Sequence, residues 1–220
     1  MSTLRAIPAL LLLAGAARAQ TAEQTIDKAA AAYAKMQTAH VVFSQTVTNP
    51  LTNKAASSKG DMIERLPGHY LVTFTVPAGD KIVSDGRVVW VYLPSTNPGQ
   101  VLKLPVGEGG TARVPDFTAY LLDDPKAHFT LSDAGAATIA GRATHIVQLV
   151  PKDKSVPFVS AKLWIDDADG IVRQFETVDG NGSLRHVRID KIEMNVPAAG
   201  HLFTFTPPAG VKVFEPGSGN

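Results

Sequence analysis

The sequence of 220 residues contains no cysteine. This absence excludes disulfide bonds, thiol chemistry and cysteine-ligated metal sites, so in an oxidising compartment the fold would rely on its apolar core. Common catalytic motifs are missing too: there is no Gly-x-Ser-x-Gly turn, no His-Glu-x-x-His pair and no glycine-rich loop ending in Gly-Lys-Ser/Thr. The sequence therefore gives no positive sign of an enzyme.

A strong charge of either sign is also lacking, because 21 basic residues nearly balance 20 acidic residues. Two of the arginines, Arg5 and Arg18, lie at the extreme N-terminus, and without them 19 basic residues face 20 acidic ones. A surface that binds nucleic acid or anionic lipid by charge needs a basic excess. The composition therefore argues against a nucleic-acid partner and against an electrostatically bound membrane.

No metal-binding pattern stands out. No two of the six histidines are two or four positions apart; they are His40, His69, His128, His145, His186 and His201. The acidic run from Asp166 to Asp169 hints at a calcium loop, but calcium-loop spacing would place Ile165 at the first ligand position. We interpret Asp169-Gly170 as a hairpin turn and expect neither a metal nor another cofactor.

Residues 1–19 have the pattern of a cleaved export signal. Arg5 precedes an apolar stretch over residues 6–15, and Ala17-Arg18-Ala19 forms a cleavage site before Gln20. The apolar stretch is too short to cross a bilayer, and no later run approaches the ~20 apolar residues of a membrane-spanning helix. We therefore expect residues 20–220 to form one mature domain in the periplasm, without a lipid anchor on an N-terminal cysteine.

The mature sequence predicts a mainly β protein with some α structure. Residues 21–36 have helical spacing of small apolar residues, and residues 114–123 favour a second, short helix. The rest favours about ten or eleven strands with short connections, which predicts a single, strongly curved antiparallel sheet. Residues 203–211 read as a last strand halted by two prolines.

The most informative stretch is the hairpin centred on Asp85-Gly86, a dipeptide that favours a two-residue type I′ turn. Its second arm, residues 88–93, is apolar at every position, whereas a strand with one buried face alternates. This arm is therefore expected to be covered on both faces. A curved sheet also has a concave face, which helices or an apolar ligand must cover.

A series of short motifs follows the export signal in a characteristic order. They are Phe43-Ser44-Gln45, Arg65-Leu66-Pro67-Gly68, Ser84-Asp85-Gly86 with Trp90 and Tyr92, Tyr120-Leu121-Leu122, Leu149-Val150-Pro151-Lys152 and residues 203–211. In this order and spacing the chain resembles the LolA family of periplasmic outer-membrane lipoprotein carriers over almost its whole mature length.

This resemblance implies an unclosed β-barrel whose apolar cavity lies under a helical lid and holds the acyl chains of lipoproteins. It also implies a monomer that accepts lipoproteins from an inner-membrane ABC transporter and passes them to an outer-membrane acceptor. The residues we expect in the acyl cavity are Leu66, Tyr70, Val72, Phe74, Trp90, Phe117 and Leu121.

One position departs from the family pattern, in which an arginine directly before the proline latches the empty lid. Here Leu66 precedes Pro67, and Arg65 stands one residue earlier. Because side chains alternate along a strand, Arg65 is expected on the face opposite to Leu66, unless a bulge restores its direction. Arg65 thus remains the latch candidate, with Leu66 as the other possibility.

Two other functions stay open at this stage. A LolA-like domain could act as a sensor that binds lipid or mislocalised lipoprotein and reports envelope stress. A periplasmic hydrolase on a β scaffold is the second alternative, disfavoured by the missing nucleophile and metal cluster.

Overall fold

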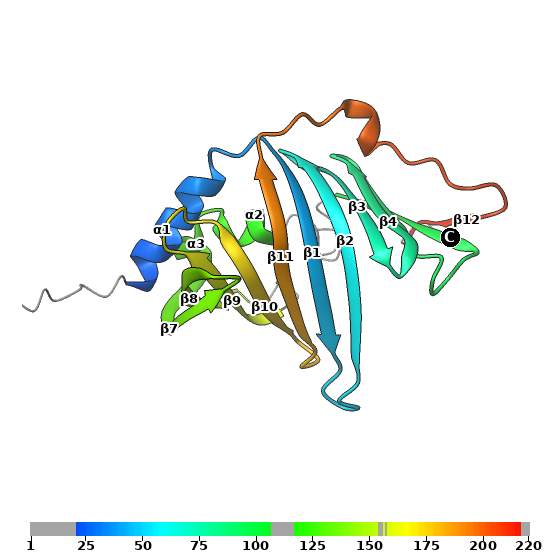
Figure 1. Ribbon diagram of the computed structural model, residues 1–220. Helices are drawn as coiled ribbons and strands as arrows, with labels where there is room; N and C mark the ends of the chain where they lie inside the picture. Colours follow the sequence, from blue (N-terminus) through cyan, green and yellow to red (C-terminus); the bar gives the residue numbers. More distant parts are fainter. Residues whose placement is uncertain (1–20, 107–116, 154–155, 157, 217–220) are drawn as a thin grey trace, which may run out of the picture.

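The structure is a computed structural model that describes residues 21–106, 117–153, 156 and 158–216. Within these residues, twelve strands form one sheet in the order β12-β6-β5-β4-β3-β2-β1-β11-β10-β9-β8-β7. The sheet is strongly curved and does not close on itself (Figure 1). The prediction of a mainly β, unclosed and curved sheet with a few helices is confirmed.

Along the chain, α1 is followed by six strands, then by α2 and α3, and then by the remaining strands and a 3₁₀ turn. Their bounds are α1 (Ala22–Tyr33), β1 (Thr38–Thr48), β2 (Ala55–Arg65), β3 (His69–Val76), β4 (Ala78–Asp85), β5 (Val88–Tyr92), β6 (Gln100–Pro105), α2 (Phe117–Leu122), α3 (Pro125–His128), β7 (Phe129–Ile139), β8 (Arg142–Pro151), β9 (Phe158–Asp166), β10 (Val172–Asp179), β11 (Leu184–Met194), the 3₁₀ turn η2 (Gly200–Phe203) and β12 (Lys212–Phe214).

Helix α1 begins with a capping box. The Thr21 hydroxyl accepts a hydrogen bond from the Gln24 backbone N–H, and the Gln24 side chain accepts one from the Thr21 N–H. This arrangement satisfies two backbone donors that the first helical turn leaves without partners. The helix ends at Tyr33, three residues before the predicted end, and the chain then turns into β1.

Local sequence explains the other differences from the predicted elements. In the central hairpin, Ser84 pairs with Val89, so that Gly86-Arg87 occupies the centre of the turn and only Gly86 has a positive φ, 85°. Type I′ requires positive φ at both centres, whereas type II′ places glycine first, as here. The Asp85 carboxylate accepts hydrogen bonds from the backbone N–H groups of Arg87 and Val88, 2.8 Å each.

The C-terminal region also departs from prediction. Residues 204–211 form no strand, because Pro207 and Pro208 offer no N–H to a ladder, and the chain instead joins the sheet through β12. Strand β12 lies parallel to β6, which is the exception to the otherwise antiparallel pairing of the described strands. Pro125 begins a short third helix, α3, just before β7.

Two layers cover opposite faces of the sheet. Helix α1 packs on the concave face of β7, β8 and β9, beside α2 and α3. The main core lies there, and its fully buried members include Ile26, Leu121, Leu149 and Leu163. On the other half of the sheet, η2 contacts the outer face of β3 and β4 (Figure 1).

Candidate functional site

A cavity of about 920 Å³ lies between the concave face of the sheet and the helices α1 and α2. This volume is near the upper end of the ~300–1,000 Å³ that ligand pockets usually span. Strands β1, β2, β3, β4, β10 and β11 supply most of its wall. The apolar residues of these strands that line the cavity are Ala39, Val41, Phe43, Met62, Val72, Phe74, Ile82, Val172, Phe175, Val187, Ile189, Ile192 and Met194.

Strand register brings the aromatic part of this wall together. Phe43 on β1 pairs with Gly60 on β2, and Gly60 pairs with Phe74 on β3. The two phenyl rings meet edge to face across Gly60, with centroids 5.9 Å apart. A Cβ atom at Gly60 would lie 2.6 Å from the Thr73 carbonyl oxygen and 3.1 Å from the Phe43 ring. The wall therefore needs glycine at this position.

The wall differs from an ordinary core in that much of it is left accessible. Phe43, Met62, Phe74 and Ile82 are only partly buried, although they pack beside buried residues such as Val72. Apolar area that folding leaves exposed inside a cavity remains available to an apolar ligand. The cavity is suited to hydrocarbon.

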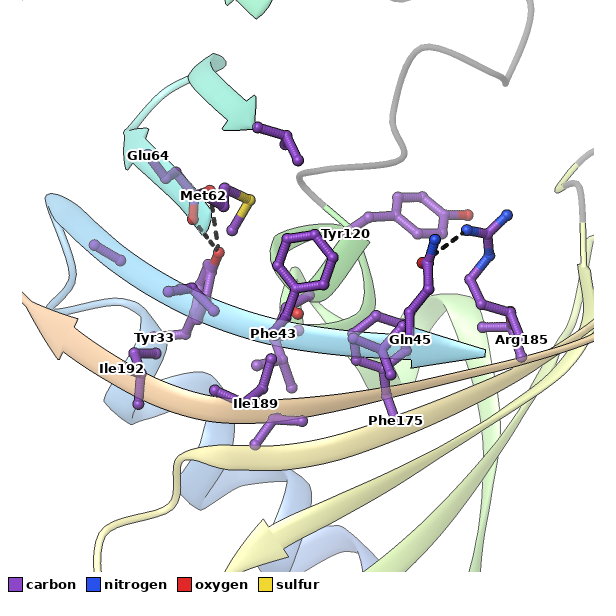
Figure 2. Close-up of a pocket in the computed structure, with 18 of the residues that line it drawn as sticks. Tyr33, Phe43, Gln45, Met62, Glu64, Tyr120, Phe175, Arg185, Ile189 and Ile192 are labelled. Carbon is purple, nitrogen blue, oxygen red and sulfur yellow. Dashed lines mark hydrogen bonds between the residues drawn. The ribbon is translucent and has the colours of Figure 1, made fainter. Parts of the chain in front are cut away.

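Polar side chains stand at two separate places in this apolar cavity (Figure 2). The Tyr33 hydroxyl on α1 contacts the carboxylate oxygens of the buried Glu64 at 3.3 and 3.4 Å. Arg185 on β11 donates through Nη1 to Oε1 of Gln45 at 3.1 Å. At ~3.3 Å per residue, Gln45 lies about 20 Å along β1 from Ala39, which pairs with Glu64.

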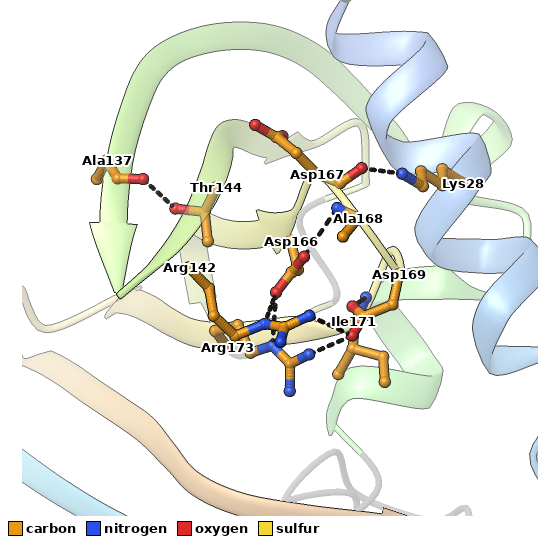
Figure 3. Close-up of polar contacts among 10 residues, drawn as sticks. All are labelled: Lys28, Ala137, Arg142, Thr144, Asp166, Asp167, Ala168, Asp169, Ile171 and Arg173. Carbon is orange, nitrogen blue, oxygen red and sulfur yellow. Dashed lines mark hydrogen bonds and ion pairs between the residues drawn. The ribbon is translucent and has the colours of Figure 1, made fainter. Parts of the chain in front are cut away.

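The position of α1 over the cavity is fixed at the turn between β9 and β10. The Lys28 ammonium donates to the Asp167 carbonyl oxygen of this turn. Gly170 lies so close to α1 that a Cβ atom there would stand 2.9 Å from the Lys28 carbonyl oxygen, and its φ of 75° also suits glycine. The helix and the turn are thus in direct contact (Figure 3).

Two arginines, Arg142 and Arg173, form ion pairs with aspartates of the same turn. Nε of Arg173 lies 3.0 Å from Oδ2 of the almost wholly buried Asp166, which Arg142 also contacts, and Nη2 of Arg142 lies 2.7 Å from Oδ2 of Asp169 (Figure 3). Burial by itself would raise the pKa of Asp166. Hydrogen bonds from Arg142, the Ala168 backbone N–H and Arg173 outweigh burial and hold this pKa well below its usual range.

Two features are absent from the described residues. No helix there combines the length and the apolar character needed to cross a membrane. In the same part of the chain, no three histidine, aspartate or glutamate side chains are placed to hold a metal ion.

A family model described as "Outer membrane lipoprotein carrier protein LolA" matches residues 34–206. This chain belongs to the LolA family. The outer-membrane lipoprotein carrier protein of Methylibium petroleiphilum is 31% identical to it over 208 residues, which are 94% of this chain and 95% of that protein. The protein of the same name from Dechloromonas aromatica is 31% identical over 174 residues, 78% of each chain.

Solved structures share the fold at low sequence identity. An uncharacterized conserved protein of Thermus thermophilus matches with a TM-score of 0.55 at 13% identity, covering 88% of this chain and 98% of its own. MucB matches with a TM-score of 0.51 at 14% identity, covering 84% of this chain and 62% of its own. Both support the LolA-like architecture of an open sheet.

The residues that the LolA resemblance suggested for the cavity are distributed over several environments. Val72 and Phe74 line the cavity. Tyr70 faces the same side of the sheet but is buried in a small cluster with Val72 and Val89. Leu121 is fully buried in the core beneath α1, while its neighbour Leu122 lines the cavity.

Of the remaining suggested residues, Trp90 and Leu66 do not line the cavity, and the side chain of Phe117 is not among those that the structure describes. Trp90 is on the outer face, where its ring packs against Phe205 with centroids 5.6 Å apart, because Val89 and Val91 take the inward positions of β5. Leu66 packs against the cluster of Met36, Ala39 and Val41. The side chain of Phe117 lies outside the described residues.

Arg65 also points to the outer face. Its guanidinium carbon lies 4.8 Å from the centroid of the Phe203 ring in η2. Arg65 and Tyr70 belong to opposite faces, since Arg65 pairs with His69, the neighbour of Tyr70. In this structure the Arg65 side chain therefore points away from the cavity.

Sequence reasoning did not select several residues that line the cavity, chiefly Phe43, Met62, Gln45 and Arg185. Phe43 and Gln45 stand in a recognised motif, and alternation along β1 places both on the same face as Val41. For Arg185 no comparable local signal exists, because it meets Gln45 through the pairing of β1 with β11, 140 residues apart.

Proposed function

We propose that the protein is a periplasmic carrier that holds the acyl chains of lipoproteins in its cavity and moves them from the inner to the outer membrane. The observation that carries the proposal is the accessible apolar wall around Phe43 and Phe74, under the helices α1 and α2, in a chain of the LolA family. The protein needs no chemistry of its own for this task.

The energetics of acyl chains explain why a carrier is needed. Each methylene buried away from water contributes ~0.8 kcal/mol, so a chain of membrane length leaves a bilayer for water very slowly. A cavity of about 920 Å³ replaces the bilayer during the crossing. Because the wall is accessible, loading does not require an existing core to be broken.

The route implies two partners. An inner-membrane ABC transporter would load the cavity, and an outer-membrane acceptor would empty it. Residues 1–19 would direct the protein to the compartment between these partners, and would then be removed before Gln20.

The test is release of newly made lipoprotein from spheroplasts into the soluble fraction. Wild-type protein should release it, whereas Phe74→Glu should fold normally and reduce release ~10-fold or more, because a carboxylate among methylenes has to be desolvated. The matched control is Thr75→Glu, at an exposed neighbour on β3 that does not line the cavity.

Two results would contradict the proposal. The first is wild-type protein that releases no lipoprotein while a positive control does. The second is loss of the native circular dichroism spectrum in Phe74→Glu, which would make Phe74 a core residue rather than a wall of the cavity.

A further inference from the structure

Gln45 and Arg185 form a polar site at one end of the largely apolar cavity (Figure 2). Gln45 lies on β1, opposite Val187 of β11, and Arg185 is two residues away on the same face of β11. Both side chains are half-buried and line the cavity. Neither residue is needed to build the apolar wall, so their presence calls for a role of its own.

Arg185 is a cation without a carboxylate partner among the ion pairs of the described residues. Asp179 also lines the cavity, but the ion pairs of the described residues do not include one between its carboxylate and Arg185. The hydrogen bond to Gln45 uses one of the five N–H donors of the guanidinium. Donors that face a cavity without a partner favour a ligand that brings acceptors.

The same hydrogen bond fixes the direction of the Gln45 amide. A guanidinium only donates, so the Gln45 oxygen must face Arg185 and its NH₂ group must face elsewhere. The pair therefore presents N–H donors from both residues, while the Gln45 oxygen already accepts one hydrogen bond from Arg185. A ligand group that accepts hydrogen bonds is favoured there over one that only donates them.

The opposite end of the cavity presents an acceptor, the buried carboxyl group of Glu64, which the Tyr33 hydroxyl contacts. An ionised carboxylate has no hydrogen to donate to an ester carbonyl. A ligand with acceptors at one end and hydrocarbon at the other is therefore held in a single direction. Its acceptors would lie at Gln45 and Arg185, and its chains would follow the wall past Phe43 and Phe74.

We propose that Gln45 and Arg185 bind the ester carbonyls of a diacylglyceryl group, and so set the direction in which acyl chains enter the cavity. This inference rests on the proposed carrier function. A diacylglyceryl group fits because its ester carbonyls accept hydrogen bonds, donate none, and stand together at the head of the hydrocarbon. Both a lipoprotein and a phospholipid carry this group.

The experiment measures binding of purified protein to three probes by displacement of a fluorescent fatty acid. The first probe is a short peptide with an N-terminal dipalmitoylglyceryl-cysteine. The second is its ether analogue, which lacks the ester carbonyls but keeps the hydrocarbon, and the third is dipalmitoyl phosphatidylglycerol. The first two differ only in the acceptors that the site should recognise.

Wild-type protein should bind the ester peptide about 10-fold more tightly than the ether peptide, as expected for hydrogen bonds from a charged donor. Arg185→Met should remove this difference and leave the affinity for the ether peptide unchanged, because methionine keeps an apolar stem. Gln45→Leu should reduce the difference less, and it serves as the second variant if Arg185→Met does not fold. Arg188→Met is the control, since Arg188 is exposed on the same strand and contacts Asp190.

Equal binding of ester and ether peptides by wild type would overturn the inference while leaving the carrier proposal intact. An ester preference that survives in Arg185→Met would overturn it too. Failure of wild type to bind any probe would remove both proposals together. If the site acts as proposed, tighter binding of the ester peptide than of phosphatidylglycerol assigns it to lipoproteins, and the reverse order assigns it to phospholipids.

Discussion

The two halves of the sheet use their concave faces differently. On β7, β8 and β9 this face is covered by α1, and the side chains between them are buried, with Leu149 and Leu163 at 0% exposure. On β1, β2 and β3 the same face is the wall of the cavity, where Phe43, Met62 and Phe74 remain partly accessible. One continuous sheet thus has a packed half and an open half.

The strands of the open half are stabilised by packing on their outer face. The segment after β11 crosses the outer face, where Phe203 is 1% exposed and Phe205 packs against Trp90 and Tyr92. Val83 and Val101 are buried on this outer face. Apolar burial on the outside stabilises these strands, so their inner face does not have to be filled for the fold to persist. This division allows an accessible cavity in a stable protein.

The largest expected effect separates the two halves by matched substitutions. Phe129→Ala should lower the free energy of unfolding by ~3–5 kcal/mol, as for other fully buried phenylalanines. Phe129 is 2% exposed and its ring lies between Phe158 and Tyr120, with centroids 6.2 and 6.0 Å away. Phe74→Ala should cost clearly less, because its ring already faces open space. Urea unfolding measures both, and equal losses would refute the division into packed and open halves.

An intermediate effect concerns the acidic turn that fixes α1 to the packed half. The folded pKa of Asp166 is lowered below the unfolded value of ~3.9, so its contribution is present above that pH and is lost as pH falls toward the folded pKa. Asp166→Asn should therefore reduce stability by ~1–3 kcal/mol at pH 7 and make the loss of stability below pH ~4 shallower.

Unfolding curves at neutral and acidic pH test this expectation. Asp190→Asn is the control, because Asp190 pairs with the exposed Arg188 at the surface, where ion pairs contribute little. If wild type and Asp166→Asn lost stability in parallel below pH ~4, the ion pairs of Asp166 would not be responsible for the acid sensitivity.

The general architecture could be predicted from sequence because its signals are local. Alternation, turn residues and a helical start at Thr21 identify the strands and α1, and the ordered motifs point to an open barrel. The tail was misassigned because Phe203-Thr204-Phe205-Thr206 alternates like a strand, yet these residues cover the outer face instead of joining the sheet.

The site was harder to predict, because its residues depend on register and distance. In β5 every position is apolar, so period two could not tell that Val89 and Val91 point inward and Trp90 outward. The Gln45–Arg185 contact joins residues 140 apart, and strand pairing alone creates it. Alternation did predict the face on which Arg65 lies. Arg65 pairs with His69 of β3, and the next residue on that strand, Tyr70, faces the opposite side of the sheet.

The smallest expected effect is at this arginine, and it tests whether opening of the cavity depends on the outer face. Arg65 stacks on Phe203, away from α1 and α2, so Arg65→Leu should cost only ~0.5–2 kcal/mol of stability, the range of a cation–π contact between a half-buried arginine and a buried ring. Transfer of bound lipoprotein to an outer-membrane acceptor should proceed at the wild-type rate.

Leu66→Arg is the matched partner variant. Leu66 packs beside Met36 just after α1, where a guanidinium could donate to helix carbonyls and favour the closed, empty state. That variant should speed transfer. Lipoprotein trapped on Arg65→Leu would instead make Arg65 the latch, and the outer face would then take part in opening the cavity.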